Sequence, residues 1–307
     1  MDCENLITAV MTDDFELCKN LLESGSNANS IMRGETWYGS TYSTPVLTLA
    51  VSRLNAEITE ILLIHGANPN VKCDVYPLLR EALDPGMSDN EEYGPIGLKL
   101  AELLLKHGAN PNAIFNSDDG TKMISEIVYM TDYKYLKLML KYGANVNFMD
   151  SKYNSTPLGL SCLAKQNFKI IKTLLEKTIN INNKCEDDDD KMYSEFQLFC
   201  KYLGVGDSDF TSKNNVQQIM EIIKMFTIRK DFQEEDRLIG IKILCNKLKK
   251  SEIQDEKETY SKIIGYLKSY KKATNVIQNF ILSVVYRPES YYVNTKLKLE
   301  FEQLCQK

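Results

Sequence analysis

The chain has 307 residues, and 43% of them are hydrophobic, so it is long enough and apolar enough to bury a core. Its formal charge of −5 combines an acidic front with a basic tail, and an acidic front opposes phosphate contacts, so we expect no nucleic-acid partner. The sequence lacks both a long apolar run and the basic start of a secretory signal, so we expect no membrane span and a cytoplasmic location.

Five segments of similar sequence follow one another in the first 182 residues. Each carries an apolar helical stripe that ends in two adjacent apolar residues, followed by a Gly position and then by two Asn residues. The segments are CKNLLESGSNAN (18–29), TEILLIHGANPN (59–70), AELLLKHGANPN (101–112), LKLMLKYGANVN (136–147) and IKTLLEKTININ (171–182). We expect the Gly to end each helix in the left-handed conformation and the Asn side chains to close the loop by bonding to nearby backbone.

A Pro at the start of a helix marks the other half of most segments. Thr44-Pro45, Tyr76-Pro77 and Thr156-Pro157 place Pro in the first turn, where its missing N–H is harmless. The fourth segment has Thr121-Lys122 instead, without Pro. The fifth has Thr178 at the Gly position, where a β-branched residue is poorly suited to a left-handed conformation.

Together these residues closely resemble the ankyrin repeat, whose pattern has T-P-L at the first helix and L-L-x-x-G-A-[DN]-x-N after the second. The resemblance implies an all-α ankyrin-repeat solenoid. The expected repeats span about 1–29, 30–70, 71–112, 113–147 and 148–182. The family's His after T-P-L is absent, since Leu47, Leu79 and Gly159 take its place. Compared with the usual length of roughly 33 residues, the chain has insertions at 30–44 and 84–97, which we expect to form loops on one face.

The last third of the chain departs from the repeat pattern. Residues 183–191 read NKCEDDDDK, and we expect this acidic run to be a solvated loop. Residues 192–307 contain several amphipathic stretches, which predict degenerate repeats followed by a helical cap or, alternatively, a separate small helical domain. A solenoid needs a cap because its last unit otherwise exposes an apolar face.

Candidate catalytic and metal-binding groups are few. The two histidines, His65 and His107, each precede the Gly of a repeat, where a helix-end position near the last carbonyls is expected. No phosphate-binding, nucleotide-binding or hydrolase motif occurs, so we expect no catalytic residues, no cofactor and no metal site. The aspartates 187–190 lack the spacing of a calcium loop. The eight dispersed cysteines are expected to be reduced, small apolar residues.

Aromatic and charged residues at the expected hairpins are the candidate partner-binding residues. Trp and Tyr are enriched among binding hot spots, although an inserted aromatic side chain can also fold back onto its own repeats. The candidates are Trp37, Tyr38 and Tyr42 in the first insertion, and Asp74, Tyr76, Asp150, Lys152 and Tyr153 in the later hairpins.

The resemblance implies a non-catalytic protein–protein interaction module, acting as a scaffold, inhibitor or adaptor. Such a monomer would bind another protein through its hairpin tips and concave face. By analogy with ankyrin proteins of intracellular bacteria and large DNA viruses, one form is a host-directed effector in the host-cell cytosol.

Two other hypotheses stay open. The alternative from a different class is an enzyme whose activity lies in 192–307 and whose repeats select the substrate. A cleft lined by Asp, Glu, Lys or Cys in that region would favour it. A third hypothesis is a tail that docks a cellular machine such as a ubiquitin ligase.

Overall fold

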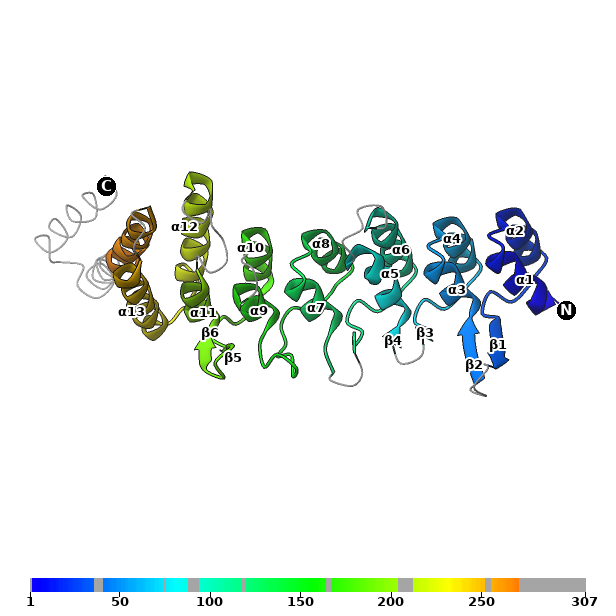
Figure 1. Ribbon diagram of the computed structural model, residues 1–307, viewed down its shortest axis with the longest axis horizontal. Helices are drawn as coiled ribbons and strands as arrows, with labels where there is room; N and C mark the ends of the chain where they lie inside the picture. The colour runs from blue at the N-terminus through cyan, green and yellow to red at the C-terminus, as the bar shows by residue number, and fades with distance from the viewer. Residues whose placement is uncertain are drawn as a thin grey trace, which may run out of the picture. The chain divides into compact units, whose positions relative to one another are not determined.

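The computed structural model describes residues 2–35, 41–73, 76–87, 94–116, 120–163, 167–203, 212–251 and 255–270. The described chain is mostly helical, as expected, and its helices follow one another in pairs along the first part of the sequence (Figure 1). It divides into two compact units, Met1–Met192 and Tyr193–Lys307. None of the helices within the described ranges has the length and apolar character needed to cross a membrane.

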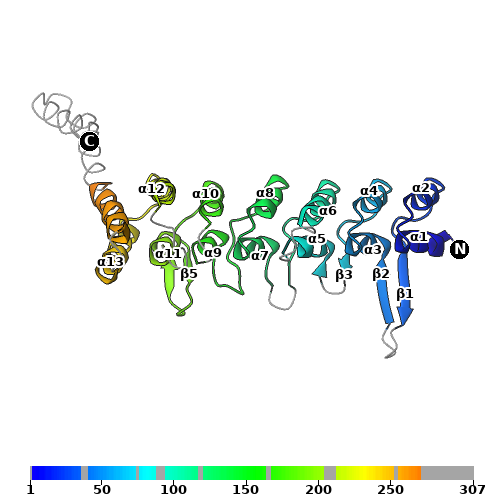
Figure 2. The same cartoon turned by 45° about the horizontal axis from the view of Figure 1, so that its top comes forward.

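The first unit is built from helix pairs whose members pack against each other. The pairs are α1 (Asp2–Met11) with α2 (Phe15–Glu23), α3 (Val46–Ser52) with α4 (Ala56–Ile64), α5 (Leu78–Met87) with α6 (Gly94–Lys106), α7 (Met123–Tyr129) with α8 (Tyr133–Lys141), and α9 (Pro157–Leu163) with α10 (Phe168–Lys177). The second helices contact one another in succession from α2 to α10, and Figure 2 shows them following one another in one row. Each pair therefore buries its apolar stripe against its neighbours as well as within itself.

The paired apolar residues at the end of each second helix form much of this core. Leu62, Leu104, Met139 and Leu174 are each fully buried. Complete burial of such a side chain contributes about 1.5–3 kcal/mol, so the repeated stripe supplies much of the stabilisation of every pair.

Glycine ends four of the second helices in the predicted way. Gly25, Gly66, Gly108 and Gly143 have φ angles of +97°, +84°, +92° and +84°, which confirms the expected left-handed conformation. At their other ends, four second helices begin after a side chain that accepts a hydrogen bond from the first turn. These N-caps are Asp14, Asn55, Asp132 and Asn167.

The two Asn residues of each loop have different partners. The first bonds locally, as predicted: the N–H of Asn70 donates to Oδ1 of Asn68 at 3.0 Å. The second bonds to the next pair, which the sequence did not predict. Nδ2 of Asn70 donates to the carbonyl oxygen of Gly108 at 2.9 Å, and its Oδ1 accepts from the N–H of Asn110 at 2.8 Å. Asn29, Asn112 and Asn147 make the same kind of double contact.

Short antiparallel hairpins connect the pairs at the start of the unit. The first joins β1 (Ile31–Glu35) to β2 (Thr41–Pro45), and the second joins β3 (Lys72–Cys73) to β4 (Tyr76–Pro77). The first insertion therefore lengthens a hairpin. The second insertion is not simply a loop: residues 84–87 and 94–97 are helical, because the extra residues lengthen α5 and α6.

The acidic segment also differs from the expected loop. Its first part forms β5 (Lys184–Glu186), which pairs with β6 (Met192–Ser194) in a third two-stranded sheet. The aspartates form the turn of this hairpin, and Asp187 is buried. A run of acidic residues in a sequence does not indicate which of them is buried and stabilises a turn.

The second unit contains helices around an aromatic core, and three of them are longer than any helix described in the first unit. The helices of the second unit are α11 (Glu195–Tyr202), α12 (Lys213–Thr227), α13 (Glu234–Lys250) and a helical stretch over 255–270. The ring of Phe196 meets Phe226 and Phe232 edge to face, with centroids 5.3 Å and 5.0 Å away. Oδ1 of the buried Asp236 accepts hydrogen bonds from Ser194 Oγ and Gln197 Nε2, both at 2.8 Å.

Candidate functional site

A groove of about 670 Å³ lies on the first unit, beside the C-terminal end of α7. We call it the Tyr129–Tyr153 groove. It is lined by Tyr129, Met130, Thr131, Lys152, Tyr153, Leu160, Leu163, Glu186, Asp187, Asp188 and Asp190. These residues come from α7 and the turn after it, a hairpin turn, α9 and the acidic turn after β5.

Two tyrosines form the aromatic wall of the groove. Tyr129 is the last residue of α7 and is 54% exposed. Its ring stacks on that of Tyr153 with centroids 5.5 Å apart and planes 22° apart. Tyr153 is presented by a tight turn, which is closed by the bridge between Asp150 and Ser155 and contains Asn154 at a positive φ of +41°. The half-buried ring of Tyr153 is fixed by its turn and supports the exposed ring of Tyr129, so the pair offers a rigid contact surface at little entropic cost.

A buried carboxylate holds this wall in place. Glu126 on α7 is 5% exposed, and its Oε1 accepts from Tyr153 Oη at 2.8 Å and from Lys152 Nζ at 2.9 Å. Burial, together with the hydrogen bond to Glu126, raises the pKa of Tyr153 to about 12. Burial is the largest single effect on Lys152 and lowers its pKa, but the hydrogen bonds to Glu126 and Tyr153 and the charges of these two groups together outweigh it and raise the pKa of that ammonium. The charge of Lys152 is thus balanced by Glu126, and the lysine adds little positive potential to the groove.

The opposite wall is acidic. Asp187 is buried, and its Oδ1 accepts from the N–H groups of Asp189 at 3.0 Å and Lys191 at 2.8 Å, which fixes the turn. The turn leaves Asp188 and Asp190 exposed on the groove. Glu186 lies beside them and accepts from Asn154 Nδ2 at 2.8 Å, which ties the acidic wall to the turn that carries the aromatic wall.

The groove joins an aromatic and apolar wall to an acidic wall. The stacked rings and the side chains of Met130, Leu160 and Leu163 form a surface suited to the apolar part of a ligand. The carboxylates opposite them attract a positively charged group. Its lining contains no His or Cys, the residues that most often act as general base or nucleophile.

Of the predicted partner-binding residues, Lys152 and Tyr153 lie in this groove, whereas Asp150 has another role. Asp150 is 1% exposed, and its Oδ2 accepts from Ser125 Oγ at 2.6 Å and from the N–H of Lys122 at 3.2 Å. The proposal that Asp150 faces a partner is therefore corrected. It is a buried acceptor that joins its turn to the start of α7.

The remaining predicted residues lie away from the groove. Tyr42 on β2 is 40% exposed, and its ring lies across Gly34 of the paired strand, where any side chain would collide with it. Tyr76 lies under the guanidinium of Arg80. Trp37, Tyr38 and Asp74 fall outside the described residues.

The sequence interpretation missed Tyr129, Met130 and the acidic wall. Tyr129 and Met130 directly follow the apolar stripe of α7, so two large exposed side chains at a helix end were a usable signal. The aspartates were noticed but were assigned to a solvated loop. Their place beside Tyr153 depends on β5 lying next to Asn154, where the N–H of Glu186 donates to the Asn154 carbonyl oxygen at 3.0 Å.

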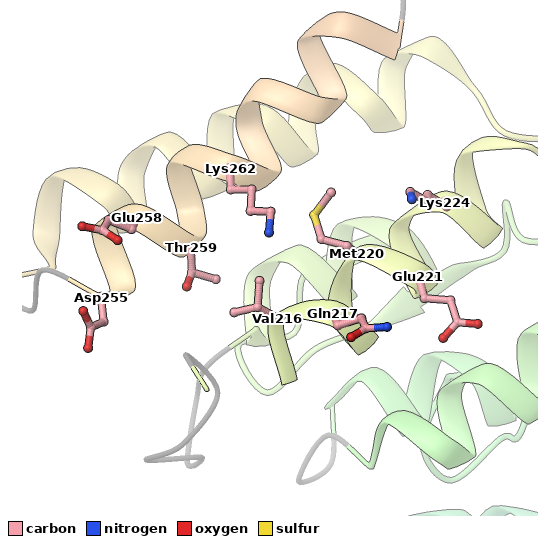
Figure 3. Close-up of a pocket in the computed structure, with 9 residues that line it drawn as sticks. All are labelled: Val216, Gln217, Met220, Glu221, Lys224, Asp255, Glu258, Thr259 and Lys262. Atoms are coloured by element: carbon pink, nitrogen blue, oxygen red, sulfur yellow. The ribbon is translucent and has the colours of Figure 1, made fainter. Parts of the chain in front are cut away.

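Figure 3 shows a second groove, on the second unit, between α12 and the helical stretch over 255–270. Its volume is about 710 Å³. Five charged side chains line it: Glu221, Lys224, Asp255, Glu258 and Lys262. All five are exposed, so water screens their charges, as is usual between two amphipathic surface helices.

Metal-binding and thiol chemistry find little support in the described part of the chain. Within it, no group of three or more His, Cys, Asp and Glu side chains is placed to hold a metal ion. Cys18, Cys162, Cys185 and Cys200 are buried free thiols, and Cys245 is a partly buried one. Burial raises the pKa of Cys18 to about 11, which keeps this thiol protonated near neutral pH.

Comparisons with known proteins add no family to this description. No protein-family model matches the chain, and no curated protein sequence matches it.

Proposed function

We propose that this chain is a non-catalytic protein-interaction module that binds a partner protein through the Tyr129–Tyr153 groove. The observation that carries the proposal is that a stack of two tyrosines, with Tyr129 exposed and Tyr153 half-buried, faces an acidic wall in one groove of the first unit. Aromatic anchors beside complementary charge are typical of residues that dominate binding energy at protein interfaces.

The proposal includes the ankyrin-repeat assignment of residues 1–182. Its support is the agreement between the five similar segments and the succession of helix pairs, the left-handed glycines at their ends and the Asn contacts from each loop to the next. Repeats of this kind stack into a solenoid and commonly bind proteins with residues at their hairpins and first helices, where this groove lies.

The proposed occupant of the groove is a lysine or arginine side chain in an exposed segment of the partner. The stem of such a side chain would lie against Tyr129 and Tyr153, and its charged head would reach Asp188 and Asp190. A cation over an aromatic face contributes about 0.5–1 kcal/mol at exposed sites and more when water is excluded.

Selection of peptides from a random displayed library on the full chain tests this function. We expect enrichment of peptides with Lys or Arg next to an apolar residue. The Tyr129→Ala variant should lose these peptides, because it removes half of the aromatic wall from an exposed position and leaves the core intact. Tyr142→Ala, which removes a tyrosine outside the groove, should retain them.

Charge supplies a second, matched comparison in the same turn. The double variant Asp188→Asn/Asp190→Asn should weaken binding of the selected peptides, whereas Asp189→Asn should not, since Asp189 is exposed but does not line the groove. Equal losses in both variants would show a diffuse charge effect and would contradict a defined site. A library with no enriched sequence would argue against the interaction function itself.

A second candidate function is an enzyme in residues 192–307, with repeats that select the substrate. The groove of Figure 3 favours it, because Asp, Glu and Lys line a cleft there. Against it, catalytic acids and bases usually lie where water is excluded, and these five side chains are exposed. A thermal-shift screen of small metabolites on the whole chain tests it. A ligand that stabilises the wild type but not Glu258→Gln would support an enzyme. Failure to find such a ligand would count against one.

A further inference from the structure

The hairpin of β1 and β2 is the longest two-stranded sheet among the described residues, with five residues in each strand. Figures 1 and 2 show it extending away from the helices of the first unit, with β1 on the side of α1 and β2 on the side of β3. β1 starts beside α1 and continues past it, and in both views no other element of the first unit lies along its outer side. The hairpin therefore has an open edge at β1.

The register of this hairpin decides which backbone groups face the open edge. Ile31 lies opposite Pro45, and the N–H of Val46 donates to the Ser30 carbonyl oxygen at 2.9 Å. Facing residues in an antiparallel pair alternate between those that exchange hydrogen bonds and those that do not. Positions 32 and 34 therefore bond to β2. The N–H and C=O groups that point outward are those of Ile31, Arg33 and Glu35.

This edge is less protected than the other strand edges. Within the described residues, the backbones of Ile31 and Arg33 form no further hydrogen bond. By contrast, β3 and β4 have only two residues each, and Pro45 removes one donor from the outer edge of β2. In β5, the N–H of Glu186 donates to the carbonyl oxygen of Asn154 in the preceding turn at 3.0 Å. β1 thus offers the longest row of outward donors and acceptors in the described chain.

The side chains of β1 give its edge a chemical preference. Ile31 and Arg33 lie on one face of the hairpin, and both are exposed, Ile31 by 44%. On the other face, the ring of Tyr42 lies across Gly34 and fills the place of a side chain. The half-buried Met32 belongs to the same face. An added strand would meet an aliphatic and a cationic side chain on one face and an apolar surface on the other.

We propose that β1 binds an extended segment of a partner protein, which adds antiparallel to the hairpin as a third strand and places an acidic residue opposite Arg33. Strand addition at an exposed edge gains affinity from main-chain hydrogen bonds and specificity from alternate side chains. An acidic residue facing Arg33 forms a favourable cross-strand pair, and an aliphatic residue suits Ile31. This goes beyond the proposed function, because the hairpin before α3 is a different surface from the Tyr129–Tyr153 groove.

A partner strand suits this edge better than a second copy of the chain. Antiparallel pairing of two β1 strands uses all three outward residues of each only in the register that sets Arg33 opposite Arg33. Like charges directly opposite each other destabilise a sheet. The arginine that opposes self-pairing therefore favours an acidic strand from another protein.

Fluorescence anisotropy with the full chain tests strand addition. The probe is the fluorescein-labelled peptide Ser-Val-Thr-Glu-Thr-Val-Ser, whose Glu and Val side chains share one face when it is extended. One control peptide is N-methylated at Glu and Val, the amides expected to face β1, and the other is N-methylated at Thr. We expect the first methylation to lower affinity about tenfold or more and the second to lower it much less, because only the first removes main-chain hydrogen bonds to β1.

Matched variants of the two edges locate the site. Arg33 and Ser43 lie opposite each other at a pair that exchanges no hydrogen bonds, so Pro at either position removes one outward N–H and leaves the bonds between β1 and β2 in place. Arg33→Pro should abolish binding, whereas Ser43→Pro, on the outer edge of β2, should keep it.

A charge reversal keeps the test valid even if a Pro variant loses stability in thermal unfolding. The wild type should prefer the Glu peptide to one with Lys in its place by about two- to fivefold, and Arg33→Glu should reverse that preference. An unchanged preference would overturn the placement of an acidic residue opposite Arg33.

Exchange of single backbone amides, measured by nuclear magnetic resonance, reports strand addition directly. The Glu peptide should slow exchange at Ile31 and Arg33, whereas the amides of Met32 and Gly34, already bonded to β2, should change little. No slowing at Ile31 and Arg33, or equal losses for the two methylated peptides, would overturn the proposal.

Two further outcomes would assign the edge differently. A dimer of the full chain in analytical ultracentrifugation that Arg33→Pro dissociates would give β1 to a second copy. Loss of binding in Ser43→Pro but not in Arg33→Pro would move the site to β2. Tyr129→Ala should change none of these results, so failure of this proposal is distinguishable from failure of the Tyr129–Tyr153 groove.

Discussion

The two units of this chain are stabilised in different ways. In the first, each helix pair repeats the same small set of contacts, and Asn70 and its equivalents bond from one loop to the backbone of the next. In the second, a single aromatic cluster around Phe196 and a buried polar network around Asp236 hold longer helices. Stability is thus distributed along the first unit and concentrated in the second.

This difference bears on where binding surfaces arise. Hairpin and turn residues can vary without disturbing the packing of the helix pairs, and the Tyr129–Tyr153 groove of the first unit depends on such residues. In the second unit, buried polar side chains such as those of Asp236 and Arg237 form hydrogen bonds that stabilise the fold. The comparison therefore predicts local, additive effects of substitution in the first unit and large, cooperative ones in the second.

The largest expected effect is that of Phe196→Ala. Phe196 is 1% exposed and contacts Phe226, Phe232 and Gly240, so its truncation leaves a large cavity in the aromatic core. We expect a loss of about 3–5 kcal/mol in the free energy of unfolding of the second unit. Hydrogen exchange of the full chain measures it by region. If amides of α2 to α8 exchange faster to the same extent, the two units unfold as one and the comparison fails.

Asp236→Ala should produce the next largest loss. It leaves the hydroxyl of Ser194 and the amide of Gln197, both buried, without their shared acceptor. We expect the second unit to lose about 1–3 kcal/mol, measured by urea unfolding with far-ultraviolet circular dichroism. Asp231→Ala, in an ion pair with Arg229 that is partly open to water, serves as the control and should cost less. Equal costs would show that the buried network has no special role.

Asn70→Ala should have a moderate effect on the first unit. It removes two hydrogen bonds between neighbouring helix pairs, worth about 1–2 kcal/mol together, whereas Asn68→Ala removes the side-chain acceptor of one local bond and should cost about half as much. Thermal unfolding of the two variants against the wild type gives the ratio. A larger loss in Asn68→Ala would mean that the Asn residues stabilise the chain by closing loops, not by joining neighbouring helix pairs.

Lys247 in the second unit predicts a smaller, pH-dependent effect. Burial lowers the pKa of its ammonium, although the neighbouring Cys200 and Glu256 oppose that shift. The unfolded value is about 10.4, so between the lowered folded pKa and that value the unfolded chain binds more protons, and stability rises with pH. The stability of the wild type relative to Lys247→Met should therefore increase as pH rises from neutrality toward about 10. Urea midpoints of both proteins measure it, and a constant or falling difference would contradict the sign.

The smallest effect expected is a gain in stability. Thr131 occupies the left-handed region at φ +58°, where a β-branched side chain is strained. Thr131→Asn should raise the free energy of unfolding by about 0.5–1 kcal/mol, because Asn tolerates this conformation. Differential scanning calorimetry detects the shift, and Thr173→Asn, on the exposed side of a regular helix, provides a control that should not stabilise. A lower melting temperature for Thr131→Asn would show that its hydroxyl or methyl group makes a contact that outweighs the strain.

Features set by local periodicity were predictable from the sequence. The apolar stripes, the left-handed glycines and the Pro at the start of α9 follow from one segment at a time. The steric requirement for glycine at position 159 was not predictable in this way. A Cβ there would lie 2.5 Å from Ser155 Oγ and 2.6 Å from Cys185 Sγ, so a residue of the following segment excludes a larger side chain.

The candidate site likewise combines residues whose position the sequence predicts with residues whose position it does not. Tyr153 and Lys152 were found because they lie at a hairpin, where partner-binding residues are expected. Asp150, two residues before Lys152, is predicted to bind a partner with them, yet its side chain turns inward to Ser125. Which face a turn residue takes depends on the hydrogen-bond donors of the preceding helix pair, and the acidic wall depends on how β5 pairs. Neither the orientation of a turn residue nor the pairing of β5 can be read from the residue spacing within one segment.

The most direct test of a binding groove on the first unit is hydrogen exchange of the full chain with and without a peptide selected on it. We expect slower exchange at residues 129–131, 152–154 and 186–190, and unchanged exchange along α12 and residues 255–270. Protection that appears along α12 and 255–270 instead, with the first unit unchanged, would contradict it and would move the functional site to the second unit.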